Sequence, residues 1–471
     1  MKKRRILLVL ILLFGVAGLA AALYGAIAGQ SDTLLLCDES PITRDAQSDF
    51  LTVAAQVEDD LKTLRGEMHL TATNRTGSLL SEVVLRLYAN AMEEGSLTLS
   101  DVKVGGSAAS WALDEEDPSV MRIETGWAQG KTLEISWHFE LSLPDTGGYT
   151  GVEDGLAWAV GALPVPAPWS EGQWQTESWD ELAEPSYAHA LDLRLSLTLP
   201  RGIQAALGGA PVAVQEHEDG TRTLTAQMRG ARDVSFAVQR GGAMRQQEQE
   251  DVLITVLAQS GSAADRLLTA AREAMSALAG IGLPYPFSAL SVVQAQTGHE
   301  DGLIGSSMIV LDGEKKGDAL LGQVTRLLAR QTFGILVEND PWNEPWLSQT
   351  PASAVELLTY RRAKGESAYE TRFYEEIEIA TRLTRPHGVT VGGSVANFGS
   401  DSEMTQVLRD QGAAMLLGIE QAVGEQAFLR ALRLYVEENA GGIADFDALE
   451  QALYEATGSR WDGYLLDGLA S

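Results

Sequence analysis

Two arginines lie one helical turn apart in the segment TRLLARQTFGILVENDPWNEPWLSQTPASAVELLTY, residues 325–360. The apolar spacing of residues 318–337 predicts a helix, and Arg326 and Arg330 fall on one side of it. With this spacing two imidazoles can hold a zinc ion, together with a carboxylate from elsewhere. A guanidinium stays protonated and has no lone pair to donate, so this pair repels a divalent cation. The chemistry left to it is ion pairing or the binding of an anion.

Other patterns that support catalysis are missing from the sequence. No histidine lies within four residues of another among His69, His138, His189, His217, His299 and His387. A hydrolase with a G-x-S-x-G turn is not indicated, because GSS at 305–307 does not match it. Cys37 is the only cysteine, which excludes an intrachain disulfide and a cysteine cluster for metal. A zinc site rebuilt around HEDGL (299–303) is the less favoured alternative.

The chain is strongly acidic. Asp and Glu number 65 against 35 Lys and Arg, a formal net charge of −30 over 471 residues. Phosphate binding needs a basic face, so this composition argues against nucleic acid as a partner. The apolar fraction of 45% and the charged fraction of 21% are typical of globular proteins, and the length allows two or three domains.

The beginning of the chain has the features of a membrane anchor. The basic cluster KKRR (2–5) precedes an uncharged, mainly apolar run, residues 6–28. As a helix this run is about 34 Å long, enough to cross a bilayer, and the basic cluster should stay in the cytoplasm. We therefore expect residues 1–30 to form a cytoplasmic leader and a single transmembrane helix in the cell membrane. Residues 31–46 would be a linker, and the bulk of the chain would be extracytoplasmic. The alternative is a signal peptide cleaved after AIA (26–28).

The hydrophobic pattern changes its period about halfway along the chain. In LEISWHFEL (133–141) and LDLRLSLTLP (191–200) apolar and polar residues alternate, which predicts half-buried antiparallel strands. Similar stretches make residues 47–243 a predicted β domain. In residues 250–471 spacings of three and four dominate beside a few short strands, which predicts a mainly helical domain. The expected fold is therefore α+β and multidomain.

Several phrases resemble the aminopeptidase N family of zinc metallopeptidases, gluzincins with a thermolysin-like catalytic domain. The phrases are GEMHLTATNRTGSLLSEVVLRLYANA (66–91), IGLPYPFSALSVVQA (281–295), NDPWNEPWLSQTPASAVELLTY (339–360) and GAAMLLGIEQAVGEQAFLRALRLYVEENAGG (412–442). The resemblance covers residues 47–466. It implies a saddle-like β domain followed by a thermolysin-like domain, and a zinc-dependent aminopeptidase activity.

Other residues occupy the family's functional positions. The first histidine ligand, the catalytic glutamate, the second histidine ligand and the third ligand fall, in this order, on Arg326, Leu327, Arg330 and Gln349. A leucine cannot take a proton from the attacking water. The glutamate that grips the substrate's amino group falls on Ile304, and the tyrosine that stabilises the oxyanion falls on Arg409. Zinc is the cofactor that the resemblance implies, but its ligands are absent, so we expect no metal and no cofactor.

Two interpretations of the arginines remain open. In the first, they pair with acidic side chains inside the old cleft, and Glu344, Glu370 and Glu375 are the candidate partners. In the second, they bind an anion such as the terminal carboxylate of a peptide. The residues predicted to line such a ligand cleft are Arg326, Arg330, Arg409, Gln349 and Glu344.

The sequence thus favours a membrane-anchored pseudopeptidase, which has the peptidase fold without its catalysis. Such a protein would bind a peptide or protein partner in the former substrate cleft, between the β domain and the helical domain. An active zinc-dependent aminopeptidase with unrecognised ligands and a structural envelope protein are the alternatives.

Overall fold

The structure is a computed structural model that describes residues 34–37, 39–40, 42, 48–145, 147–379 and 388–470. The predicted leader and transmembrane helix (1–30) and most of the predicted linker (31–46) lie outside the described residues. No helix in the described part of the chain is both long and apolar enough to cross a membrane. The elements discussed below all belong to one compact unit, Leu36–Ser471.

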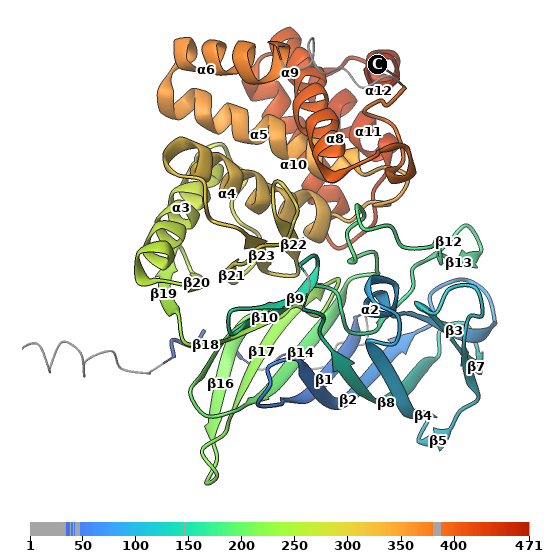
Figure 1. The fold of residues 1–471 in the computed structure, drawn as a ribbon. Helices are drawn as coiled ribbons and strands as arrows, with labels where there is room; N and C mark the ends of the chain where they lie inside the picture. Colours follow the sequence, from blue (N-terminus) through green and yellow to red (C-terminus); the bar gives the residue numbers. More distant parts are fainter. Residues whose placement is uncertain are drawn as a thin grey trace, which may run out of the picture. The chain divides into compact units, whose positions relative to one another are not determined.

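The first half of this unit is a β domain built around an eight-stranded sheet (Figure 1). The strand order is β16 (Ala210–Glu216), β17 (Arg222–Ala231), β14 (Leu191–Leu199), β1 (Asp49–Val57), β2 (Thr63–Thr73), β8 (Thr132–Ser142), β4 (Leu97–Val104) and β5 (Ser107–Ala108). Neighbouring strands run antiparallel, as predicted, except that β1 and β14 pair in parallel. In β8 the alternation separates a buried face, Ile135 to Leu141 at odd numbers, from a polar face.

Smaller sheets complete the β domain. One has the order β15 (Ile203–Leu207), β18 (Phe236–Arg240), β10 (Leu156–Ala159) and β9 (Thr150–Glu153). A second has the order β11 (Val165–Pro166), β3 (Leu80–Arg86), β7 (Val120–Trp127) and β6 (Trp111–Leu113). A two-stranded ribbon, β12 (Trp169–Ser170) and β13 (Gln173–Trp174), and the short helix α2 (Tyr88–Met92) lie in the connections.

The second half begins with a mixed five-stranded sheet. Its order is β19 (Ala243–Gln249), β20 (Val252–Ala258), β21 (Ala289–Gln294), β23 (Met308–Leu311) and β22 (Leu303–Gly305). The three central strands are parallel, and the two outer strands are antiparallel to their neighbours. Strand β19 falls between the two predicted domains, and its pairing with β20 assigns it to the second one.

Helices make up the rest of the chain, so the fold is α+β with a β-rich N-terminal region and a helical C-terminal region. They are α3 (Gly261–Gly280), α4 (Gly317–Gln331), η1 (Thr332–Leu336), α5 (Trp346–Lys364), α6 (Glu366–Arg372), η2 (Phe373–Glu378), η3 (Val395–Asn397), α8 (Asp401–Thr405), η4 (Gln406–Gln411), α9 (Gly412–Val423), α10 (Glu425–Asn439), α11 (Phe446–Thr457) and α12 (Asp462–Leu469). The predicted helix over 318–337 is α4, whose last turn loosens into the π-helical turn η1. Helix α4 packs between α3, α5 and the edge strand β22.

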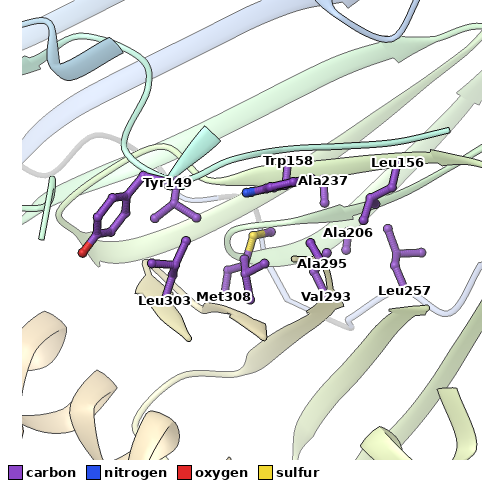
Figure 2. Packing of buried hydrophobic residues seen from close by; sticks show 12 residues of the cluster. Tyr149, Leu156, Trp158, Ala206, Ala237, Leu257, Val293, Ala295, Leu303 and Met308 are labelled. Carbon is purple, nitrogen blue, oxygen red and sulfur yellow. The ribbon is translucent and has the colours of Figure 1, made fainter. Parts of the chain in front are cut away.

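An apolar cluster, here called the junction core, joins the two halves. Figure 2 shows Tyr149, Trp158 and Ala237 of the β domain facing residues such as Met308 and Leu257 of the five-stranded sheet. All its members are buried: Tyr149, Leu156, Trp158, Val160, Ala206, Ala237, Leu257, Val293, Ala295, Leu303, Met308 and Val310. Along this sheet the junction of the two domains is therefore packed with side chains, whereas a pocket of about 370 Å³ lies beside it, lined by residues that include Tyr149, Trp179, His299 and Asp401.

Polar contacts reinforce the same junction. Arg232 of the β domain is fully buried, and its guanidinium donates to the carbonyl oxygens of Ile335 at 3.0 Å and Gly442 at 2.7 Å. Its neighbour Asp233 accepts hydrogen bonds from the backbone N–H of Ser306 at 2.7 Å and from its hydroxyl at 2.9 Å. These bonds satisfy buried groups that would otherwise be strongly unfavourable.

Truncation of the junction core should destabilise both halves together. Leu257→Ala removes a fully buried side chain, and we expect the free energy of unfolding to fall by about 2–5 kcal/mol. Leu79→Ala is the matched control, since Leu79 is 73% exposed, and should change stability by less than about 0.5 kcal/mol. Denaturant unfolding followed by tryptophan fluorescence and circular dichroism measures both. Separate transitions for strands and helices would contradict a shared core.

Candidate functional site

Both predicted arginines are buried on α4. Arg326 is 7% exposed and Arg330 is 8% exposed, because α5 and β22 cover the face of the helix that carries them. Asp318 in the first turn of α4 and Arg330 in its last turn both suit the helix dipole. Burial of two guanidiniums is tolerated only when carboxylates accept their hydrogen bonds, so the partners of these residues decide what the site can do.

Arg326 is bound by a carboxylate on the predicted HEDGL loop. Its Nε lies 3.0 Å from Asp301 Oδ2 and its Nη2 lies 2.7 Å from Asp301 Oδ1, which is a two-pronged contact. Burial alone would raise the pKa of Asp301. The charge and the hydrogen bonds of Arg326 outweigh burial and hold that pKa well below its ordinary value. Arg409 Nη1 lies 3.6 Å and Lys315 Nζ lies 3.8 Å from Asp301 Oδ1, and both charges lower the pKa of Asp301 further.

The loop that carries Asp301 is itself held in place. His299 Nδ1 lies 3.2 Å from Asp401 Oδ1, and the backbone N–H of Glu300 donates to Asp401 Oδ2 at 2.7 Å. The His299 ring lies edge-on to Tyr149, with 5.1 Å between the ring centres. In the described structure the histidine of HEDGL therefore orients a loop, and no second histidine accompanies it.

The ion pairs continue beyond Arg326. Its Nη1 lies 3.6 Å from Glu356 Oε2 on α5, and Arg372 of α6 donates to both oxygens of Glu356 at 2.7 and 3.1 Å. Arg409 of η4 donates to Asp410 at 2.8 Å and to Glu300 at 3.3 Å. We call this set the arginine–carboxylate network; its members are Arg326, Arg372, Arg409, Glu300, Asp301, Glu356 and Asp410.

Arg330 has a different partner, contributed by the β domain. Its Nη2 donates to Oε1 of Glu184, which lies in the connection between β13 and β14. Burial would lower the pKa of Arg330, and the charge of Glu184 opposes burial and raises it. Beside this pair, a Cβ added to Gly334 would lie 3.3 Å from Glu184 Oε2 and 3.3 Å from Ile304 Cδ1. The space around Arg330 is therefore filled by the protein itself.

The other residues predicted to fall on the family's functional positions have no ionisable side chain. Leu327 and Ile304 are fully buried apolar side chains. Gln349 is 9% exposed, and its side-chain amide makes no hydrogen bond to the described residues. Zinc would need imidazole nitrogens and a carboxylate at about 2.0–2.2 Å, whereas this position offers two protonated guanidiniums and an amide. The residues do not fit the metal, and the described residues contain no other group of three His, Cys, Asp or Glu that could hold one.

The predicted counter-charges are wrong. Asp301, Glu356 and Glu184 pair with the arginines of α4, and the predicted Glu344, Glu370 and Glu375 do not. Glu344 instead accepts a hydrogen bond from the backbone N–H of Phe446. Its burial, with the nearby charge of Asp445, raises its pKa to about 7. The partner of Arg330 was missed because Glu184 is 146 residues away from it in the sequence.

A cavity of about 1100 Å³ opens on one side of the network. It lies among α4, α5, α6, η2, α8 and η4, within the helical region rather than at the domain junction. Of the five residues predicted to share a ligand cleft, Arg326 and Arg409 line this cavity, and Arg330, Gln349 and Glu344 do not. Its walls otherwise carry hydroxyl groups and paired charges, including Ser353, Tyr360, Ser367 and Thr371.

Comparison with known proteins gives a family for this part of the chain. Residues 312–465 match the peptidase family M1 domain. Aminopeptidase N from Lactobacillus delbrueckii subsp. lactis is 27% identical over 139 residues, which cover 28% of this chain and 16% of that protein. Aminopeptidase M1-B from Oryza sativa subsp. japonica is 28% identical over 138 residues, which cover 29% and 16%. These matches confirm the family resemblance predicted from the sequence: residues 312–465 are similar to the M1 peptidase domain of aminopeptidase N-like proteins. The matched part spans about a sixth of the length of these relatives.

Loss of the Asp301 carboxylate should be severe. Asp301→Asn keeps the shape but leaves the Arg326 guanidinium buried without its main counter-charge, so we expect a loss of about 3–5 kcal/mol in the free energy of unfolding. Asp318→Asn is the control, because the exposed Asp318–Lys364 pair should contribute about 0–1 kcal/mol.

The same pair predicts a pH dependence. The pKa of Asp301 is lowered by folding, so its stabilising effect is fully present above the unfolded pKa of about 3.9 and is lost as the pH falls below it. The difference in unfolding free energy between wild type and Asp301→Asn should stay constant from pH 7 to pH 5 and shrink by pH 3. An undiminished difference at pH 3 would show that Asp301 is not the charged partner.

Proposed function

We propose that this chain is a catalytically inactive aminopeptidase-like protein that binds a peptide or protein partner in its helical region. A single observation carries the proposal. The side chain at the family's first zinc-ligand position, Arg326, is a guanidinium held by two hydrogen bonds to the buried carboxylate of Asp301. A metal ion cannot take the place of this guanidinium without breaking both of its hydrogen bonds to Asp301, whose other cationic neighbours, Arg409 and Lys315, lie at 3.6 and 3.8 Å.

The absence of a base supports the loss of catalysis. Hydrolysis of a peptide bond by this family's chemistry needs a metal-bound water and a carboxylate that takes its proton. Leu327 and Ile304 stand at the two glutamate positions, and both are buried among apolar groups. Arg409, at the position of the oxyanion-stabilising tyrosine, forms ion pairs with Asp410, Glu300 and Asp301.

The binding role is supported by the cavity beside the network. Its volume of about 1100 Å³ is slightly above the usual range of ligand pockets, about 300–1,000 Å³. Because Arg326 and Arg409 already face carboxylates of the chain, the cavity presents hydroxyl groups and balanced charge rather than a free cationic site. A short polar peptide segment, with its own donors and acceptors, fits such a lining better than a bare anion does.

The proposal places the protein at the cell membrane. The basic residues 2–5 and the uncharged run 6–28 support a single-pass anchor with the bulk of the chain extracytoplasmic. The partner would then be a periplasmic or extracellular peptide or protein. The net charge of −30 argues against nucleic acid.

Purified full-length protein should neither retain zinc nor hydrolyse aminoacyl amides. After incubation with zinc and removal of the free metal, we expect far less than one zinc per chain by elemental analysis. We also expect no chelator-sensitive release from alanyl or leucyl amides, in an assay calibrated with an active aminopeptidase N. One zinc per chain together with chelator-sensitive turnover would instead identify an active enzyme with unrecognised ligands.

Filling the cavity should abolish peptide binding. The probe is a pool of random hexapeptides, recovered from immobilised full-length protein and quantified by mass spectrometry. We expect wild type and Ala363→Trp to retain peptides, and Ala368→Trp to retain at least tenfold less. Ala368 lines the cavity, whereas Ala363 is exposed on α5 outside it.

Two comparisons make this binding test decisive. Hexapeptides with free and with amidated C-termini should bind equally, because the arginines are already paired; a preference for free carboxylates would favour an anion site instead. Equal melting temperatures of the two tryptophan variants exclude misfolding. If wild type retains no peptide, the peptide-binding role is wrong, and a structural envelope protein becomes the better explanation.

A further inference from the structure

A second pocket, remote from the network, is lined by arginines without acidic residues. It has a volume of about 700 Å³ and lies where α3, α5, α9 and α11 meet α10. Its polar lining consists of Arg362, Gln426, Arg430 and Arg433, together with the backbone of the turn Gly280–Gly282. The chain has a net charge of −30, whereas the lining of this pocket carries three guanidiniums and no carboxylate. The charge of the pocket lining is therefore opposite in sign to that of the chain as a whole.

Helix geometry brings the cationic groups together. Gln426, Arg430 and Arg433 are spaced by four and three residues on α10, so their side chains share one face. That face looks onto the turn after α3, where Arg433 Nη1 donates to the carbonyl oxygen of Ile281 at 3.2 Å. Gly282 makes this approach possible, because a Cβ there would lie 2.9 Å from Arg433 Nη1.

Two of the arginines keep most of their donors free. Arg362 makes three hydrogen bonds, two to Glu425 and one to the Gly280 carbonyl oxygen. Arg433 has a single hydrogen bond, to Ile281, and Arg430 has neither a hydrogen bond nor an ion pair within the described residues. Each guanidinium has five N–H donors. Capping of the C-terminal end of α3 explains the contacts of Arg362 and Arg433, but it does not account for Arg430.

We propose that this pocket binds an oxyanion, a phosphate or carboxylate group carried by a small organic ligand. Arginine pairs recognise both groups through two parallel hydrogen bonds. The apolar part of the lining, Ile281, Val423, Ala427, Leu429 and Ala456, would contact the uncharged part of the ligand. This site is separate from the cavity beside α4, and it stands whether or not that cavity binds peptides.

The test is titration of the full-length chain with inorganic phosphate and, separately, with acetate, by calorimetry at constant ionic strength set with chloride. We expect saturable binding of at least one anion, weakened at least tenfold by Arg430→Gln and by Arg433→Gln. Arg266→Gln is the matched control, since Arg266 is an exposed arginine on α3 that lies outside the pocket. Binding should also weaken as the salt concentration rises.

The outcomes separate the possibilities. Binding of phosphate alone assigns phosphate esters as the ligand class, and binding of acetate alone assigns carboxylates. Absence of saturable binding of either anion, or equal binding by wild type and Arg430→Gln, overturns the proposal. Ala368→Trp, which fills the other cavity, should leave anion binding unchanged, so failure of one site is distinguishable from failure of the other.

Discussion

The buried pair of Arg326 and Asp301 is the interaction on which the rest of the site depends. A guanidinium removed from water is strongly unfavourable unless carboxylates accept its hydrogen bonds. Asp301 meets Nε and Nη2, and Glu356 lies opposite Nη1. Glu356 in turn is held by Arg372, which reaches Glu376, a residue whose side chain is 60% exposed. The network is thus a chain of ion pairs that begins at the buried Arg326 and ends at Glu376, which water can solvate.

The two sides of the network differ in how much open space they leave for a ligand. Toward the β domain, the Arg330–Glu184 pair fills the space beside Arg330, and a smaller pocket of about 370 Å³ lies between Tyr149 and Trp179 on one side and His299 and Asp401 on the other. Toward the helices, Arg326 borders the cavity, whose far wall is formed by α6, η2 and η4. Two of these elements, η2 and η4, are π-helical turns, which interrupt regular helix packing and recur at functional sites. The proposed peptide site, the larger of these two pockets, therefore lies in the helical region.

Local patterns in the sequence predicted the elements well and their partners poorly. The alternation of LEISWHFEL and the spacing of α4 reflect which face is buried, so both elements were identified from the sequence. Glu356 could also have been predicted as a partner of Arg326, because it follows Gln349 by two turns of α5 and lies on the same face of that helix. Glu184 could not have been predicted as the partner of Arg330, since it belongs to a loop of the β domain, and that loop has no periodic sequence pattern. The place of the cavity depends on long-range packing in the same way.

The ion pairs give a physical reason for keeping the register of the helix that carries positions 326 and 330. A histidine at position 326 would leave Asp301 without the guanidinium that meets both of its oxygens, and a histidine at 330 would leave Glu184 as a buried carboxylate without its partner. Conversely, an arginine placed there without these acids would be a buried, unpaired cation. We expect either single change to lower the stability of the fold, because residues in one network are strongly coupled. Once guanidiniums and carboxylates occupy the site together, its helices keep their register, because the register is now what aligns the ion pairs.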